Sequence, residues 1–209
     1  MKKLIAIISF IAMASVAMAQ TAEEIITRME TEMNKHDESE GLAMTIDIKV
    51  FILGTMSSRA YTLGDKSRVE ASVMGKDLIT WDDGVTTWIY DSEKNEIELK
   101  NTATKEKSDS DGDVKMFEGI TDGYDVSIDK ETSTEWHIRC KKAKKNPDKD
   151  APKKMDLVIA KGTYLPVSLS ASMKGIDMTM REISFGVTEK QVTFDPKAYP
   201  NAKIVDNRQ

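Results

Sequence analysis

Residues 79–90, ITWDDGVTTWIY, place two segments rich in apolar residues on either side of the pair Asp83-Gly84. An Asp-Gly pair between two such segments is typical of a β-hairpin with a two-residue turn. This turn pairs Ile79 with Trp88 across the hairpin. One face of the predicted hairpin then carries four large side chains, namely Ile79, Trp81, Trp88 and Tyr90. We interpret them as an apolar patch that lines a concavity or belongs to a core.

Similar alternation of apolar and polar residues continues in both directions along the chain. In residues 44–52, MTIDIKVFI, side chains such as Ile46 and Ile48 point one way and Thr45 and Asp47 the other. Ten segments carry this strand pattern: 44–52, 68–74, 77–81, 85–91, 95–100, 124–129, 135–141, 154–160, 164–173 and 176–185. The links between most of them are short and turn-like, which favours sequential antiparallel pairing in a long meander.

Residues 21–36, TAEEIITRMETEMNKH, carry a helical pattern instead. Thr21 and Glu24 have the spacing of a capping box, so a helix is expected to start there. Its apolar stripe must be covered by other parts of the protein and consists of Ala22, Ile25, Ile26, Met29 and Met33. Residues 108–120 predict a second, short helix between strands. The predicted fold is mainly β with α, a curved antiparallel sheet forming an unclosed half-barrel, with both helices against its concave face.

The first 19 residues have the pattern of a secretory signal peptide. Lys2 and Lys3 precede an apolar run that ends in Ala17-Met18-Ala19, so cleavage is expected after Ala19. Residues 20–209 would then form one domain in the periplasm, and Gln20 stands where a bacterial lipoprotein has its acylated cysteine. The formal charge would change from −5 to −7, because the leader carries two lysines and no acidic residue. Such a charge argues against nucleic acid as a partner.

Groups suited to catalysis are few. His36 lies in a polar run and His137 alternates with apolar residues on a strand, so both are expected to be structural or exposed. Cys140, the only cysteine, is expected to be a buried, inert thiol. DSDGD at 109–113 lacks the glycine and glutamate spacing of an EF-hand. We therefore expect no enzyme, catalytic residue, metal or cofactor.

Two compositional features leave alternatives open. Residues 141–154, KKAKKNPDKDAPKK, hold seven lysines, which indicates a solvated loop or a docking site for an acidic partner or an anionic lipid surface. Methionines recur within the predicted strands, including Met178 and Met180. They are either core filling or, with Ile46 and Ile48, the wall of an adaptable apolar cavity.

Three stretches resemble the outer-membrane lipoprotein carrier proteins, the LolA/LolB superfamily. DDGVTTWIYDSEKNEIEL at 82–99 is similar to a stretch with Asp-Gly, then Trp-x-Tyr-Asp and a returning strand, and KSRVEASV at 66–73 to a strand that carries an arginine. VTFDPKAYPNAKIVDNR at 192–208 looks like the family's last strand and tail. The residues that match the sharpest motif are Asp83, Gly84, Trp88, Tyr90 and Asp91. Gln20 favours the periplasmic carrier branch over the membrane-anchored acceptor branch.

The resemblance implies a periplasmic carrier that takes acylated lipoprotein or lipid from an inner-membrane release complex and ferries it to an outer-membrane acceptor. The predicted acyl-binding residues are Ile79, Trp81, Trp88, Tyr90, Ile46, Ile48, Met178 and Met180. The resemblance also implies a helix lid held by a strand arginine, which makes Arg68, Ile25 and Met29 the candidate lid or gate. An alternative from another class is a cell-envelope sensor or regulatory interaction protein that uses the same half-barrel to bind lipid or protein.

Overall fold

The computed structural model describes residues 20–37, 39–50, 54–73, 75–102 and 117–208. The expected signal peptide at 1–19, the DSDGD segment and most of the predicted helix at 108–120 lie outside these residues. Phe117 is the first residue of this predicted helix that the structure describes, and its side chain is fully buried in the core. Within the described part of the chain, no helix is long and apolar enough to cross a membrane.

In the described residues, twelve strands form one sheet. Their bounds are β1 Leu42–Val50, β2 Gly54–Leu63, β3 Lys66–Val73, β4 Lys76–Asp82, β5 Thr86–Asp91, β6 Glu96–Asn101, β7 Tyr124–Glu131, β8 Glu135–Lys142, β9 Lys154–Ala160, β10 Pro166–Met173, β11 Ile176–Phe185 and β12 Lys203–Asp206. The helices are α1 (Ala22–Met33), α2 (Glu189–Val192) and the 3-10 helix η2 (Pro196–Ala198).

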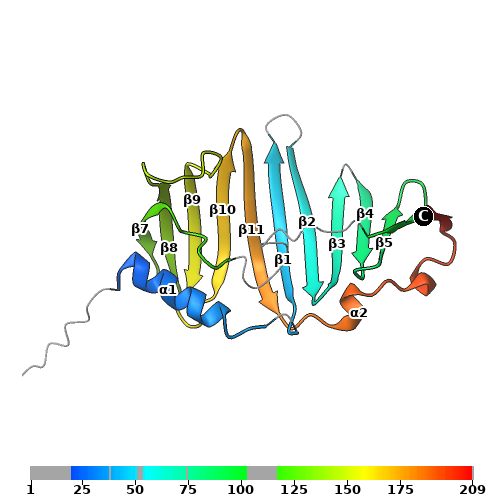
Figure 1. Ribbon diagram of the computed structural model, residues 1–209, viewed down its shortest axis with the longest axis horizontal. Coiled ribbons are helices and arrows are strands. Elements are labelled where there is room, and N and C mark those ends of the chain that lie inside the picture. Colours follow the sequence, from blue (N-terminus) through cyan, green and yellow to red (C-terminus); the bar gives the residue numbers. More distant parts are fainter. Residues whose placement is uncertain (1–19, 38, 51–53, 74, 103–116, 209) are drawn as a thin grey trace, which may run out of the picture.

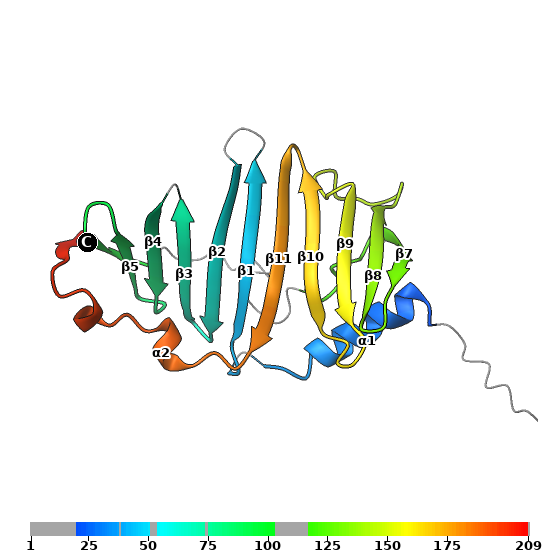
Figure 2. The ribbon, with the colours of Figure 1, turned by 180° about the vertical axis from the view of Figure 1, so that it is seen from behind.

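The strand order is β12-β6-β5-β4-β3-β2-β1-β11-β10-β9-β8-β7. Two antiparallel meanders, β1 to β6 and β7 to β11, are therefore joined in the middle by the pairing of β1 with β11 (Figures 1 and 2). The edges β12 and β7 do not pair with each other, so the sheet stays open. This confirms the predicted mainly β, unclosed architecture. The prediction of one long meander was too simple, because β6 and β7 lie near opposite edges of the sheet and β12 pairs with β6 in parallel.

The ten-strand pattern missed β2, which lies in the middle of the sheet. Its sequence, GTMSSRAYTL, is rich in small and polar residues, and none of its side chains is fully buried. A strand with no buried face shows no alternation of apolar and polar residues, so it cannot be recognised by period. Pairing with β1 and β3, rather than burial of its own side chains, sets its place.

Helix α1 begins as predicted, because Thr21 and Glu24 form both hydrogen bonds of the capping box. Every residue of its apolar stripe is buried. The stripe packs on one face of β8 to β10, against side chains such as Ile138, Leu157 and Leu169. We call this side of the sheet the helix face. Figure 1 shows α1 at the β7–β10 end and α2 in the other half of the molecule.

The other side of the sheet, named the arginine face after Arg59 and Arg181, is covered in the opposite half of the molecule. Val187 and Val192 of the segment around α2 pack with Ala43, Tyr61 and Leu63. Directly opposite residues of neighbouring strands point to the same side, and successive residues of one strand point to opposite sides. By this rule Tyr61, which pairs with Ala43, lies on the side away from α1. The sheet is thus covered on different sides at its two ends.

The hairpin of residues 79–90 differs from the prediction by a register shift of two residues. Ile79 pairs with Tyr90, and Trp81 with Trp88. The loop is longer than two residues because the Asp83 carboxylate accepts hydrogen bonds from the backbone N–H groups of Val85 and Thr86, at 2.9 and 2.7 Å. A shift of two keeps every side chain on its predicted side, so the four large residues do share one face.

Candidate functional site

The predicted acyl-binding residues fall into two groups on opposite sides of the sheet. Thr45 lies opposite Arg59, and Arg59 lies opposite Glu70. Glu70 in turn lies opposite Ile79, which places Ile79 on the side of Thr45. Ile46 follows Thr45 and points the other way. One cavity therefore cannot be lined by all eight residues.

Ile46, Ile48, Met178 and Met180 form the helix-face group. Ile46 pairs with Met180 and Ile48 with Met178, and all four side chains are half-buried. Met180 packs against the core under α1, so the group continues that core toward the middle of the sheet.

Further apolar residues extend this group across neighbouring strands on the same side. Val69 and Leu78 are 38% and 44% exposed. We call the combined surface the apolar strip, and it consists of Ile46, Ile48, Met56, Val69, Val73, Leu78, Met178 and Met180. Val73, at 39% exposed, is a third accessible member of the strip.

The aromatic group lies on the arginine face and is covered by the chain's own C-terminal segment. Trp88 stacks on Phe194 with ring centroids 5.5 Å apart, and Tyr90 contacts Tyr199 at 4.5 Å. Trp81 contacts both covering rings and is only 3% exposed. Trp88 and Tyr90 are half-buried beneath this segment, so the group is covered only in part.

The candidate gate residues also separate. Ile25 and Met29 belong to α1 and are fully buried against the helix face of the sheet. Arg68 lies opposite Trp81 on the arginine face, with its guanidinium 5.3 Å from the indole ring and 2.7 Å from Glu70. Its buried Nε has no hydrogen-bond partner among the described residues. Arg68 is therefore not placed to hold α1 closed.

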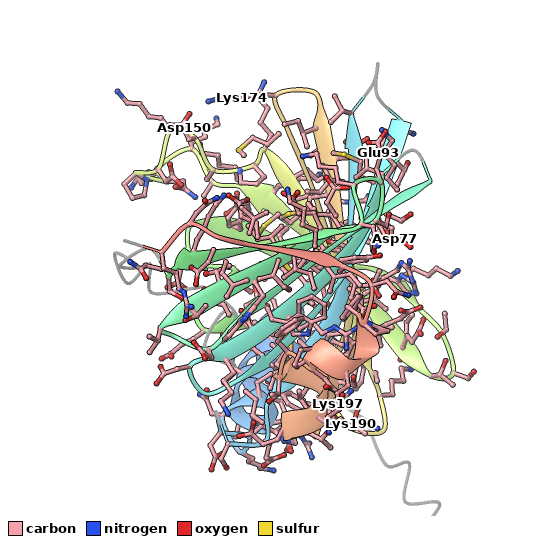
Figure 3. All side chains as sticks on the ribbon, turned by 90° about the vertical axis from the view of Figure 1, so that its right-hand side faces the viewer. Asp77, Glu93, Asp150, Lys174, Lys190 and Lys197 are labelled. Carbon is pink, nitrogen blue, oxygen red and sulfur yellow. The ribbon has the colours of Figure 1, made fainter. Side chains whose placement is uncertain are left out.

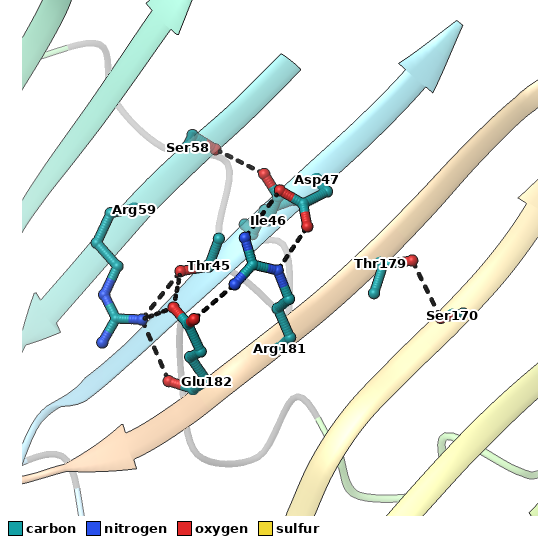
Figure 4. A network of polar contacts seen from close by, with 9 residues as sticks. All are labelled: Thr45, Ile46, Asp47, Ser58, Arg59, Ser170, Thr179, Arg181 and Glu182. Carbon is teal, nitrogen blue, oxygen red and sulfur yellow. Dashed lines mark hydrogen bonds and ion pairs between the residues drawn. The ribbon is translucent and has the colours of Figure 1, made fainter. Parts of the chain in front are cut away.

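A polar network on the arginine face was not predicted from the sequence. Arg181 donates from Nε to Asp47 at 2.6 Å and from a terminal nitrogen to Glu182 at 2.6 Å (Figure 4). The other Glu182 carboxylate oxygen accepts from Thr45 at 2.7 Å and from Arg59 at 3.2 Å. Glu182 has a φ of 54°, in the left-handed region, at the bulge where β11 shifts register against β1. The bulge brings two neighbouring charges of β11 into one network.

Hydrogen bonds and charges in this network lower the pKa values of both of its carboxylates. Hydrogen bonds from Arg181 and Ser57, in that order, lower the pKa of Asp47. The hydrogen bond from Thr45 lowers the pKa of Glu182, with Arg181 and Arg59 acting in the same direction. The network borders an open groove of about 440 Å³, which is lined by Ala71 and Ile79 and otherwise by polar residues of β1 to β4 and β11. A groove of mixed charge is unsuited to acyl chains, so the two sides of the sheet differ in chemistry.

His36 and Cys140 both have structural surroundings. His36 stacks on Phe185 at 3.7 Å and its Nδ1 lies 2.8 Å from Glu40. Cys140 is fully buried, as predicted, and burial raises the pKa of its thiol to about 11. In the described ranges, no three His, Cys, Asp or Glu side chains are grouped to hold a metal.

Comparison with known proteins finds similarity in structure only. No protein-family model matches the sequence, and neither does any curated protein. LprF from Mycobacterium bovis is similar over 79% of this chain and 93% of its own, with 9% identity and a TM-score of 0.50. An uncharacterized conserved protein from Thermus thermophilus covers 89% and 99% at 19% identity, with a TM-score of 0.44. A LolA superfamily protein from Nitrosomonas europaea covers 85% and 99% at 9% identity, with a TM-score of 0.33. Such low identities concern the fold alone, and the fold is the one that the chain shares with LprF.

Proposed function

We propose that this protein is a periplasmic carrier that binds the acyl chains of lipoproteins or lipids on the apolar strip and ferries them toward the outer membrane. The observation that carries the proposal is the strip itself, a row of accessible Ile, Met, Val and Leu side chains continuous with the core under α1. Exposed apolar patches of this kind mark binding sites for apolar partners. The proposed activity is binding and transfer, without chemistry on the cargo.

The energetics suit an acyl chain. Removing a methylene from water contributes about 0.8 kcal/mol, so a long chain on the strip could gain on the order of 10 kcal/mol before the costs of ordering it. Methionines such as Met178 and Met180 adapt to chains of different shape because their side chains are unbranched and flexible. A carrier also has to release its cargo. In this proposal α1, whose buried stripe includes Ile25 and Met29, covers the core beside the strip, and Arg68 is left out of the gate.

Binding of a fluorescent fatty-acyl probe tests the proposal. Val69→Asp and Ile48→Asp each put a charge into the strip, and each is expected to weaken probe binding at least about tenfold, because the carboxylate would lose its water when the chain binds. Fluorescence titration gives the Kd, and thermal unfolding followed by circular dichroism verifies that each variant is folded.

Ser72→Asp is the matched control. Ser72 lies on β3, the strand of Val69, is exposed, and points to the arginine face. The control should bind the probe like the unchanged protein. Equal losses in Ser72→Asp and Val69→Asp, or full binding in both strip variants, would contradict an acyl site on the helix face.

A further inference from the structure

The loop between β8 and β9, residues 143–153, is lysine-rich and is held in shape by its own contacts. The Nζ of Lys142 donates to the backbone carbonyls of Lys149 and Ala151 at 3.1 and 3.4 Å. The Asn146 amide donates to the carbonyl of Gly123 at 2.9 Å, and the Tyr124 hydroxyl donates to that of Pro152 at 3.0 Å. The loop therefore presents its remaining lysines from a defined backbone.

The charge of this region is opposite to that of the whole chain. Residues 141–154 hold seven lysines and two aspartates, a formal charge of +5, whereas the chain carries −5. Five exposed lysines have no ion-pair partner within the part of the chain that the structure describes: Lys141, Lys144, Lys145, Lys149 and Lys153. Five unneutralised ammonium groups in so short a segment form a concentrated cationic surface.

The tip of the β10–β11 hairpin adjoins this loop. Lys174 at the tip forms an ion pair with Asp150 of the loop at 2.7 Å, and both lie at the upper end of the molecule in Figure 3. Met173 and Ile176 flank Lys174, pair with each other across the hairpin, and are each 43% exposed. They lie on the helix face, next to Met178 along β11. The cationic surface and the apolar strip thus meet at one end of the sheet.

We propose that the loop and this hairpin tip, together called the lysine rim, dock the protein on an anionic phospholipid membrane. The ammonium groups would lie among lipid phosphates while Met173 and Ile176 enter the interface. Exposed apolar side chains beside a cluster of lysines are what an anionic bilayer binds. An acidic protein would use the lysines but would leave the exposed apolar pair without a role. The proposal rests on the rim alone and holds whether or not the strip binds acyl chains.

Vesicle binding tests the rim. The probe is phosphatidylglycerol–phosphatidylcholine vesicles, compared with vesicles of phosphatidylcholine only, in a sedimentation assay. Replacing Lys144, Lys145 and Lys149 together by alanine should weaken binding to the anionic vesicles about 100-fold, since each lysine near such a surface contributes roughly a fivefold factor. Added salt should weaken the binding of the unchanged protein, because the charges are exposed and screened.

The matched control removes three exposed lysines elsewhere. Lys130, Lys190 and Lys197 have no ion-pair partner among the described residues, and Figure 3 shows the last two at the lower end of the molecule. The triple alanine variant of these residues changes the net charge equally and should keep vesicle affinity within about threefold. Ile176→Ser tests the apolar contact and should weaken binding, whereas Ile204→Ser, at a 53% exposed residue in the other half, should not.

Three results would overturn the proposal. They are equal losses in both lysine triples, equal binding to neutral and anionic vesicles, and binding to an acidic protein without any vesicle binding. The acyl-binding proposal and the rim proposal can fail independently, because each has its own variants. The rim triple variant should still bind the acyl probe in solution, and Val69→Asp should still bind vesicles.

Discussion

At the residue scale, Asp47 links β1 to β11, the two strands at which the meanders meet. Its carboxylate is only partly exposed and accepts two hydrogen bonds from Arg181 across the β1–β11 pair. We predict that Asp47→Asn lowers the free energy of unfolding at pH 7 by up to about 1 kcal/mol, the range of partly exposed ion pairs. Urea unfolding measures the change. Asp150→Asn is the control, because its pair with Lys174 is far more exposed, and it should have no measurable effect.

The pH dependence of this difference follows from the lowered pKa of Asp47. The folded-state pKa lies below the ordinary value of 3.8, so the contribution of the charged form is fully present above that value. It is lost as the pH falls through the folded-state pKa. The difference between the unchanged protein and Asp47→Asn should therefore be constant from about pH 7 to 5 and shrink below about pH 4. A difference that grows on acidification would contradict this assignment.

Single residues also show what the sequence could and could not reveal. That Trp81 and Trp88 share one side of the sheet was predicted correctly although the register was not, because alternation depends only on whether a residue is odd or even along the strand. The network of Asp47, Arg181 and Glu182 could not be found in this way. It depends on a bulge and on the pairing of strands more than 130 residues apart, as the separation of Arg181 and Asp47 shows.

At the element scale, α1 is the part whose sequence pattern was fully matched by the structure. Its cap and its apolar stripe are both local, so neither depends on distant parts of the chain. Thr21→Ala removes the hydroxyl that accepts from the backbone N–H of Glu24 at 3.2 Å. We predict a loss of about 1 kcal/mol in the free energy of unfolding, measured by chemical denaturation.

Thr27→Ala provides the comparison within the same helix. Thr27 is exposed in the middle of α1, where alanine has the higher helix propensity, so this variant should be unchanged or slightly more stable. Equal destabilisation by the two substitutions would mean that the cap contributes nothing.

Strand β2 is the opposite case to α1, because its position comes from pairing with β1 and β3 and leaves no alternation of apolar and polar residues in its own sequence.

At the scale of the whole molecule, the sheet carries one core on the helix face and another on the arginine face. Which side of a strand is covered was not readable from the strand itself, because the covering elements come from far along the chain. The aromatic hairpin is covered by Phe194 and Tyr199, and the strands near the other edge by α1. The eight residues expected to form one binding site therefore belong to two surfaces. Four of them lie in the apolar strip on the helix face, and the other four lie in the aromatic hairpin on the arginine face.

This separation can be tested by pairing one variant from each side. Phe194→Ala removes the ring that stacks on Trp88 and contacts Trp81, and it should lower the free energy of unfolding by about 3 kcal/mol. Because Phe194 lies on the arginine face, the folded variant should bind the fluorescent fatty-acyl probe with unchanged affinity. Val69→Asp should show the reverse, with weakened probe binding and nearly unchanged stability, since Val69 is partly exposed. Loss of probe binding by Phe194→Ala, at a temperature where it is still folded, would move the acyl site to the aromatic cluster and leave the apolar strip without this role.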